Sequence, residues 1–372
     1  MAGIKDIAKK AGVSISTVSY ALNGSPKVTE ETRARIQAIA NELNYVPNMA
    51  ARTLKRRQTK IIGVYLADYG GSFYGELLEG IKKGLALFDY EMIVCSGHKS
   101  HLFIPEKMVD GAIILDWTFS TEEIQMFADR GHPIVILDRI MVHENVRQVL
   151  LDNRGGTTLA VEQFFNGHSK KVHLIAGPKN GYDSQERLTI SQRELARFGI
   201  TYEVFQGDFT EPSGYQAAKE IIKQSENFPI DIFALNDEMA IGVYKYVKET
   251  PYEIGQDIRI IGFDNSELGA FVQPRLATIA YSKHRWGMVA AEKIIHLIQE
   301  EMRALLSVML ITLTIGTFCF SFLEKVSLFD SFYWSFITLT TIGFGDIHPV
   351  TVLGKLFTIL YATFGLGIMS IF

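Results

Sequence analysis

Residues 340–349, TTIGFGDIHP, carry backbone chemistry of an unusual kind. Glycines at positions 343 and 345 allow alternating backbone conformations, so successive carbonyl groups can point to the same side. Several copies of such a loop around one axis would replace the hydration shell of a cation with rings of oxygen atoms. The candidate ion filter consists of Thr341, Ile342, Gly343, Phe344, Gly345 and Asp346.

A second set of chemical groups follows seven short β-branched runs between residues 60 and 265, which are predicted strands: KIIGVYLA, YEMIVCS, GAIILD, PIVILD, KVHLIAG, DIFALND and IRIIGFDN. Runs that are apolar on both faces and alternate with helical patterns are typical of parallel sheets covered on both sides. Ligands of such sheets bind at the carboxyl ends of the strands. The polar residues at these ends are therefore candidates for one cleft, or alternatively for helix caps: Asp68, Asp116, Asp138, Asp152, Asn236, Asp237 and Asp264.

The sequence patterns of common enzymes are missing from this chain. It has no Gly-x-Ser-x-Gly elbow, no phosphate-binding loop, no Gly-x-Gly-x-x-Gly and no His/Cys cluster with metal-ligand spacing. The two cysteines, Cys95 and Cys319, have no partner at a redox or metal spacing, which indicates a reducing compartment. We predict a binding protein without a cofactor, and not an enzyme.

Charge is distributed unevenly along the chain. Residues 1–60 hold eleven Lys or Arg against four Asp or Glu and carry +7, while the remaining 312 residues carry −11. A basic head on an acidic body indicates a polyanionic partner, with a merely solvated basic face as the alternative. The N-terminus has no apolar signal-peptide core, so the first 300 residues are expected in the cytoplasm.

The basic head has the pattern of a helix, a short turn and a second helix. Residues 4–11 place apolar side chains on one helical face, and Gly12 then permits a tight turn before a helix at about residues 16–23. A third helix is expected over residues 30–44 after a Thr29 cap. Short polar side chains on the second helix would let it enter the major groove of DNA.

Residues 4–54, IKDIAKKAGVSISTVSYALNGSPKVTEETRARIQAIANELNYVPNMAARTL, resemble almost end to end the DNA-binding head of the lactose-repressor (LacI) family of bacterial regulators. The resemblance implies a helix-turn-helix head over residues 1–47 and a hinge helix within 48–59. It also implies a homodimer on operator DNA, with Leu54 wedged into a minor-groove step. The implied DNA-binding residues are Ser16, Thr17, Ser19, Tyr20, Asn23, Arg52, Leu54 and Lys55.

Residues 60–300 resemble the effector-binding core of the same family, which is related to periplasmic sugar-binding proteins. The motifs VILDR, LLDNRGG, ALNDEMAIGV and IIGFDN stand in the family's order. The resemblance implies a sugar-like effector that stacks on Phe73 and whose hydroxyl groups meet Arg187, Asp237 and Asp264. The implied effector-binding residues are Phe73, Asp138, Asn153, Arg187, Asn236, Asp237 and Asp264, with Arg139 as a further candidate.

The body departs from this family pattern in three places, one of which is the stretch after Arg187, which looks shortened. Between Cys95 and Val109 only thirteen residues intervene, too few for the long helix expected there. The helix at 289–299 should be followed by strands that complete the second subdomain, and no such sequence is present. We therefore expect an α/β core of two parallel-sheet subdomains without its C-terminal strands, and an incomplete effector site.

After residue 301 the composition becomes that of a membrane segment. Residues 304–323 are twenty consecutive uncharged residues, enough to cross a bilayer core of about 30 Å. With the filter loop, the segment 302–372 resembles the pore module of potassium channels: outer helix 304–323, pore helix and filter 329–346, inner helix 353–372. The resemblance implies potassium ions at the filter carbonyls, four subunits and residence in the cell membrane; buried helices of a soluble protein are the alternative.

Two interpretations of the whole chain remain open at this point. In one, a DNA-binding repressor that responds to a sugar-like effector is joined to a membrane pore, or a potassium channel is gated by a cytoplasmic ligand-sensing domain. In the other, a truncated repressor is joined to a truncated pore near residue 300. The missing strands and the absence of a linker between the two parts favour this interpretation. A two-fold DNA-binding dimer and a four-fold pore could coexist as a dimer of dimers.

Overall fold

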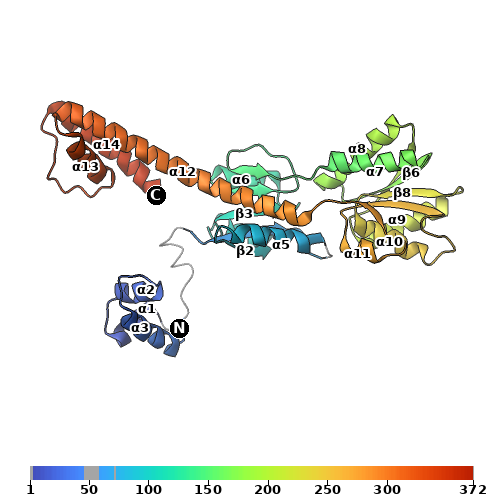
Figure 1. The fold of residues 1–372 in the computed structure, drawn as a ribbon, viewed down its shortest axis with the longest axis horizontal. Helices are drawn as coiled ribbons and strands as arrows, with labels where there is room; N and C mark the ends of the chain where they lie inside the picture. Colours follow the sequence, from blue (N-terminus) through green and yellow to red (C-terminus); the bar gives the residue numbers. More distant parts are fainter. Residues whose placement is uncertain (1–2, 46–57, 71–72, 372) are drawn as a thin grey trace. The chain divides into compact units, whose positions relative to one another are not determined.

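The computed structural model describes residues 3–45, 58–70 and 73–371, and the chain forms two compact units, Met1–Thr59 and Lys60–Phe372 (Figure 1). The first unit contains α1 (Ile4–Ala11), α2 (Ile15–Leu22) and α3 (Glu30–Glu42). Their apolar faces meet in a small core in which Ile7, Val18 and Ile36 are completely buried. The helical head predicted from the sequence is confirmed.

Local residues fix the ends of these three helices. Gly12 ends α1 with a φ of 66°, in the left-handed region that favours glycine. The Ser14 hydroxyl accepts a hydrogen bond from the Thr17 amide at 3.1 Å and so caps the start of α2. Thr29 caps α3 through the Thr32 amide in the same way. The helix-turn-helix geometry thus follows from a glycine and two hydroxyl caps.

The second unit is built on two five-stranded sheets in which every pairing is parallel. The first sheet has the order β2-β1-β3-β4-β5 and the second has the order β10-β9-β8-β6-β7. The strands are β1 (Ile61–Leu66), β2 (Glu91–Cys95), β3 (Gly111–Leu115), β4 (Ile134–Ile136), β5 (Val146–Gln148), β6 (Lys171–Ala176), β7 (Thr201–Gln206), β8 (Ile230–Ala234), β9 (Ile258–Phe263) and β10 (Ala277–Ile279). The predicted pair of parallel α/β subdomains is confirmed.

Helices cover both faces of each sheet. The first sheet is flanked by α5 (Phe73–Ala86), α6 (Thr121–Asp129) and the start of α12 (Lys283–Glu324), and the second by α7 (Asn153–Asn166), α8 (Tyr182–Arg197), α9 (Glu211–Gln224), α10 (Asp237–Val247) and α11 (Glu267–Phe271). The short connection after β2 is a 3-10 helix, His98–Phe103, in place of a long helix. No strand follows β10 within residues 280–371.

The packing of α5 against α12 depends on two glycines. A Cβ atom at Gly80 would clash with the His284 carbonyl, and one at Gly287 would clash with the Leu77 carbonyl. The two helices lie side by side (Figure 1), at a distance that larger residues would not permit. This contact fixes the start of α12 against the first sheet.

Helix α12 continues through the point where the composition of the chain changes. The helices expected at 289–299 and 304–323 form one element of 42 residues, Lys283–Glu324. The intervening residues, Glu300-Glu301-Met302-Arg303, contain no Gly or Pro, and all of them favour a helix. The effector domain and the apolar segment therefore share one helix instead of meeting at a flexible linker.

The apolar part of α12 packs against α13 (Leu328–Leu339) and α14 (Val352–Ile371). Phe320, Trp334 and Tyr361 are buried between these helices, with the Phe320 and Trp334 rings stacked at 3.8 Å between centroids. The Glu324 carboxylate accepts hydrogen bonds from the Val350 and Thr351 amides and so ties the end of α12 to the start of α14. Residues Leu306–Glu324 are long and apolar enough to cross a membrane, and α14 contributes a shorter apolar run, Val352–Gly367.

Candidate functional site

A cleft of about 760 Å³ opens at the carboxyl ends of strands in both halves of the second unit. The first half contributes residues that follow β1, β3 and β4, and the second half contributes residues that follow β6, β7, β8 and β9. Its principal lining residues are Asp68, Phe73, Tyr74, Trp117, Asp138, Arg139, Asp183, Arg187, Phe209, Asn236, Asp237, Asp264 and Lys283. The strand-end polar groups predicted to share one cleft do so, except Asp116 and Asp152, which are not among the residues that line it.

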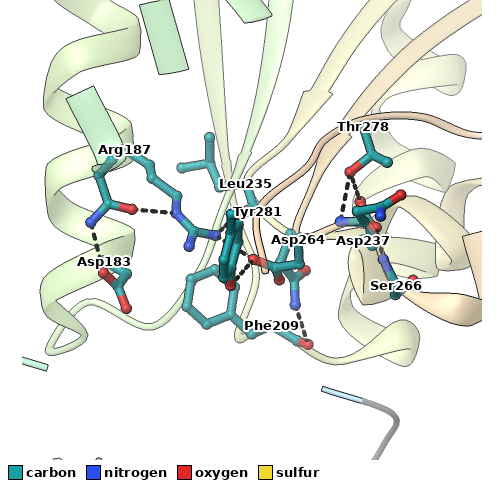
Figure 2. Close-up of polar contacts among 12 residues, drawn as sticks. Asp183, Arg187, Phe209, Leu235, Asp237, Asp264, Ser266, Thr278 and Tyr281 are labelled. Carbon is teal, nitrogen blue, oxygen red and sulfur yellow. Dashed lines mark hydrogen bonds and ion pairs between the residues drawn. The ribbon is translucent and has the colours of Figure 1, made fainter. Parts of the chain in front are cut away.

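Arg187 is the centre of the polar network in the second half of the cleft (Figure 2). Only 3 % of its surface is exposed. Its guanidinium donates to the Asn153 side-chain oxygen at 2.9 Å, to the Leu235 carbonyl at 2.7 Å and to the Asp264 carboxylate at 3.3 Å. The same group lies 3.7 Å above the Phe263 ring, a cation–π contact. These contacts leave the guanidinium a single orientation.

Asp264 faces Arg187 from the end of β9. Its carboxylate also accepts a hydrogen bond from the Tyr281 hydroxyl at 3.0 Å. Its backbone has a φ of 112°, a costly conformation for a residue with a side chain, and its carbonyl accepts a hydrogen bond from the buried Lys283 at 2.7 Å. Lys283 is the first residue of α12, so the strained turn at Asp264 is directly bonded to that helix.

Asp237 is occupied by contacts within the protein (Figure 2). One carboxylate oxygen accepts from the Ser266 amide at 2.6 Å and the other from the Thr278 hydroxyl at 2.6 Å. Burial, and after it the neighbouring Asp264 carboxylate, raise the pKa of Asp237 from 3.8 to about 7, although the bonds from Thr278 and Ser266 oppose the shift. Asp237 thus holds the loop after β9 and places Asp264.

Two predicted amides also act through contacts within the protein. Asn153 lies at the start of α7 and is not among the lining residues; its amide bonds both Arg187 and, at 2.7 Å, Asp183. Asn236 lines the cleft but caps α10 by accepting from the Met239 amide, and donates to the Phe209 carbonyl. Asn153 thereby orients the charged groups Arg187 and Asp183, which line the cleft.

The first half of the cleft is organised by an arginine. Arg139 pairs with both oxygens of the Asp138 carboxylate, at 2.8 and 3.0 Å. It also donates to the Asp116 and Phe119 carbonyls, at 2.8 and 2.6 Å. These bonds span the turn that carries Trp117, which sequence reasoning did not single out.

Aromatic side chains complete the lining. Phe73, the first residue of α5, is half-buried and meets the rings of Tyr74 and Trp286 edge-on. Burial, and then the carboxylates of Asp68, Asp116, Glu238 and Asp264, raise the pKa of Tyr74 to about 12. Tyr74, Trp117, Asp183 and Phe209 were missed from the sequence because neither strand ends nor family motifs mark them.

In the first unit, the predicted DNA-binding residues of α2 differ in exposure. Ser16 and Asn23 are exposed, whereas Thr17, Ser19 and Tyr20 are half-buried. The Asn23 amide donates to the Ser19 carbonyl at 2.7 Å and closes the end of α2. The hinge helix and its residues Arg52, Leu54 and Lys55 lie outside the described residues.

The predicted filter, Thr341–Asp346, lies in the exposed loop between α13 and α14. Thr341, Gly343 and Gly345 have φ values of 59°, 56° and 78°, so left-handed residues alternate along the loop. The Gly343 amide donates to the Ile337 carbonyl, and the Asp346 carboxylate bonds the Tyr333 hydroxyl. The loop is thus attached to α13 at two points.

Comparison with known proteins places these parts in families. The family model described as "Bacterial regulatory proteins, lacI family" matches residues 3–48, and the one described as "Periplasmic binding protein-like domain" matches residues 161–317. The HTH-type transcriptional repressor PurR of Pectobacterium carotovorum is 32 % identical over 303 residues, which cover 78 % of this chain and 88 % of PurR. The chain belongs to the LacI family. It is a DNA-binding transcriptional repressor with an effector-binding domain, and the prediction that it is not an enzyme is confirmed.

Solved structures of this family agree with the fold. A sugar-binding LacI-family regulator from Enterococcus faecalis is 79 % identical, with a TM-score of 0.63 over 66 % of this chain and 92 % of that one. A LacI-family regulator from Enterococcus faecium with bound ribose is 26 % identical, with a TM-score of 0.59 over 64 % and 90 % of the two chains. A third family model, described as "Ion channel", matches residues 306–372.

Proposed function

We propose that this LacI-family chain represses transcription by binding operator DNA as a homodimer, and that a sugar-like effector in the cleft controls the binding. The observation that carries the proposal is the convergence of hydroxyl-binding groups from both halves of the second unit on one cleft. Arg187 and Asp264 offer a donor and an acceptor, and Phe73 offers an apolar ring face. A ligand that failed to pair with them would leave buried polar groups unsatisfied, at a cost of about 1–3 kcal/mol for each group.

Control of DNA binding follows from the position of the cleft between two subdomains. An effector that contacts Asp138 or Phe73 on one side and Arg187 or Asp264 on the other favours the closed arrangement of the two halves. Closure changes the separation of the paired heads in the dimer and disorders the hinge helix, which weakens operator binding. On DNA, Ser16, Thr17, Ser19, Tyr20 and Asn23 would contact bases and phosphates, and Arg52, Leu54 and Lys55 would hold the hinge in the minor groove.

The DNA-binding part of the proposal is tested on an operator selected from a random-sequence library by the full chain. Tyr20→Ala should lower the affinity for the selected operator by at least about tenfold, the loss expected when a side chain at a base edge is removed. Gln37→Ala, an exposed position of α3, serves as the matched control. Equal affinities of Tyr20→Ala and the unaltered chain would refute the assignment of α2 as the recognition helix.

We propose a second activity for the C-terminal segment, a potassium-conducting pore in the cell membrane. The supporting observations are the ion-channel match over residues 306–372, the alternating left-handed residues in the filter loop and the membrane-length part of α12. In four copies, the carbonyls of Thr341, Ile342, Gly343, Phe344 and Gly345 would coordinate potassium, with Asp346 at the outer end. Two DNA-binding dimers would supply these four copies.

The pore is tested in two steps. The full chain is expressed and its intact mass is sought in the membrane and cytosolic fractions; recovery only in the cytosol contradicts the proposal. The purified chain is then reconstituted into vesicles, and potassium flux is measured. Gly343→Ala should abolish the flux, because alanine disfavours the φ of 56° at this position.

A further inference from the structure

Trp117 is an exposed aromatic residue at the cleft for which neither the fold nor the proposed contacts account. Slightly more than half of its surface, 53 %, is accessible, and it lines the cleft from the turn after β3. A tryptophan left in solvent forgoes a large gain from burial. Its neighbour Phe119 is completely buried, so the turn itself is well packed.

The turn that carries Trp117 is held rigidly. Arg139 bridges the carbonyls of Asp116 and Phe119, as described above. The Asp116 carboxylate accepts a hydrogen bond from the Thr118 amide at 2.8 Å. Because Asp138 in turn fixes Arg139 with two bonds, the backbone on both sides of Trp117 is anchored. An exposed ring on an anchored turn is preorganised for a planar contact with a ligand.

The charge of the cleft restricts the ligand further. The described lining includes eight carboxyl side chains (Asp68, Asp138, Asp183, Asp208, Glu211, Asp237, Glu238 and Asp264) and three cationic ones. Each cation is already paired within the protein: Arg139 with Asp138, Arg187 with Asp264, and Lys283 with Glu76 at 3.4 Å. A phosphate or carboxylate on the ligand would therefore enter a field that is negative on balance, and would compete with these carboxylates for the three cations.

The volume of the cleft indicates a ligand larger than one sugar ring. The cleft of about 760 Å³ lies in the upper half of the range of about 300–1,000 Å³ that holds drug-sized ligands. A single sugar ring fills only part of this space, so a ring on Phe73 leaves room for a second one. We propose that the effector is a sugar of two or more rings without phosphate or carboxylate groups, and that Trp117 carries the second ring.

The proposal rests on the proposed sugar response and is tested by titration calorimetry on the full chain. The protein is kept in a detergent without a sugar head group, since maltosides would themselves present a disaccharide. The probes are glucose, galactose and xylose, the neutral disaccharides cellobiose, maltose, lactose and trehalose, and the anionic trehalose 6-phosphate and glucose 6-phosphate. A neutral disaccharide should bind more tightly than its constituent rings, and the phosphorylated sugars should bind more weakly than their neutral parents.

Variants then locate the second ring. Trp117→Ala should weaken the best disaccharide by about tenfold, the effect of removing one aromatic anchor, and leave monosaccharide affinity within about twofold. Trp117→Phe should restore most of the affinity. The matched control is Phe271→Ala, which removes an aromatic ring that is 74 % exposed and lies outside the cleft lining.

The outcomes distinguish failure of this inference from failure of the proposed sugar response. If a monosaccharide binds as tightly as any disaccharide and Trp117→Ala changes nothing, this inference is overturned while the sugar response stands. Tighter binding of a phosphorylated sugar than of its neutral parent refutes the charge argument. If no sugar in the panel binds, the sugar response and this inference fail together.

Discussion

Replacing Arg187 by methionine should destabilise the effector domain by about 3 kcal/mol, the lower end of the cost of breaking a buried ion pair. Methionine keeps most of the apolar stem but removes the donors to Asn153, Leu235 and Asp264. Asp264 keeps the hydrogen bond from the Tyr281 hydroxyl, but loses its arginine. The cost should lie at the lower end of that range because Asp264 borders the cleft, where water can reach the carboxylate once the arginine is gone.

The assay is thermal unfolding of the full chain, followed by tryptophan fluorescence in a Trp334→Phe background. Trp117 and Trp286 then report on the effector domain alone. For a domain of this size about 1 kcal/mol corresponds to about 2–4 °C, so the midpoint should fall by roughly 6–12 °C. Arg193→Met on the same helix is the matched control, since Arg193 is exposed and its partner Glu194 keeps a second ion pair with Arg197, so the loss should be less than about 1 kcal/mol.

A double variant tests the reasoning independently. Arg187→Met combined with Asp264→Asn removes the uncompensated charge. The double variant should therefore lose less free energy of unfolding than the sum of the losses in the two single variants. Two results would refute the view that the ion pair with Asp264 is the main stabilising contact of Arg187. One is an unfolding midpoint for Arg187→Met within about 2 °C of that of the unaltered chain, and the other is exact additivity of the two changes in the free energy of unfolding.

Two further perturbations follow from the structure. The pKa of Asp237 is raised to about 7 in the folded chain. The folded state therefore binds more protons than the unfolded state between about pH 4 and 7. Through this residue, the stability of the fold decreases as the pH rises through that window. Asp237→Asn should reduce this fall by a few kcal/mol, measured as unfolding midpoints at pH 5 and pH 8, and an unchanged pH dependence would contradict the assignment. Gly287→Ala should cost about 1–3 kcal/mol in urea unfolding, because its Cβ meets the Leu77 carbonyl and separates α5 from α12. Gly75→Ala, on the same α5 but with open space around it, should be neutral or stabilising.

Local patterns in the sequence determined much of this fold. The β-branched runs gave seven of the ten strands, and the Gly12 turn and the Thr29 cap located the helices of the head. The three missed strands are two of three residues, β5 and β10, and the half-exposed edge strand β7. Such short or solvent-facing segments bury too few residues to leave a hydrophobic signature.

Longer-range features could not be seen in the same way. Composition placed a boundary near residue 300, yet backbone propensity is continuous there and α12 crosses it without a break. A change in hydrophobicity marks a change of surroundings, and only a break in backbone propensity ends a helix.

The cleft shows most clearly what each source of information decided. The family resemblance pointed to Phe73 and Arg187, and both the resemblance and a strand end pointed to Asp264; all three line the cleft. Only the tertiary structure decided which of the polar residues face a ligand and which hold others in place, as Asp237 does for the loop after β9. The physical reason is that one carboxylate or amide can serve a ligand or its neighbours with the same atoms, and that choice depends on contacts between residues far apart in the chain.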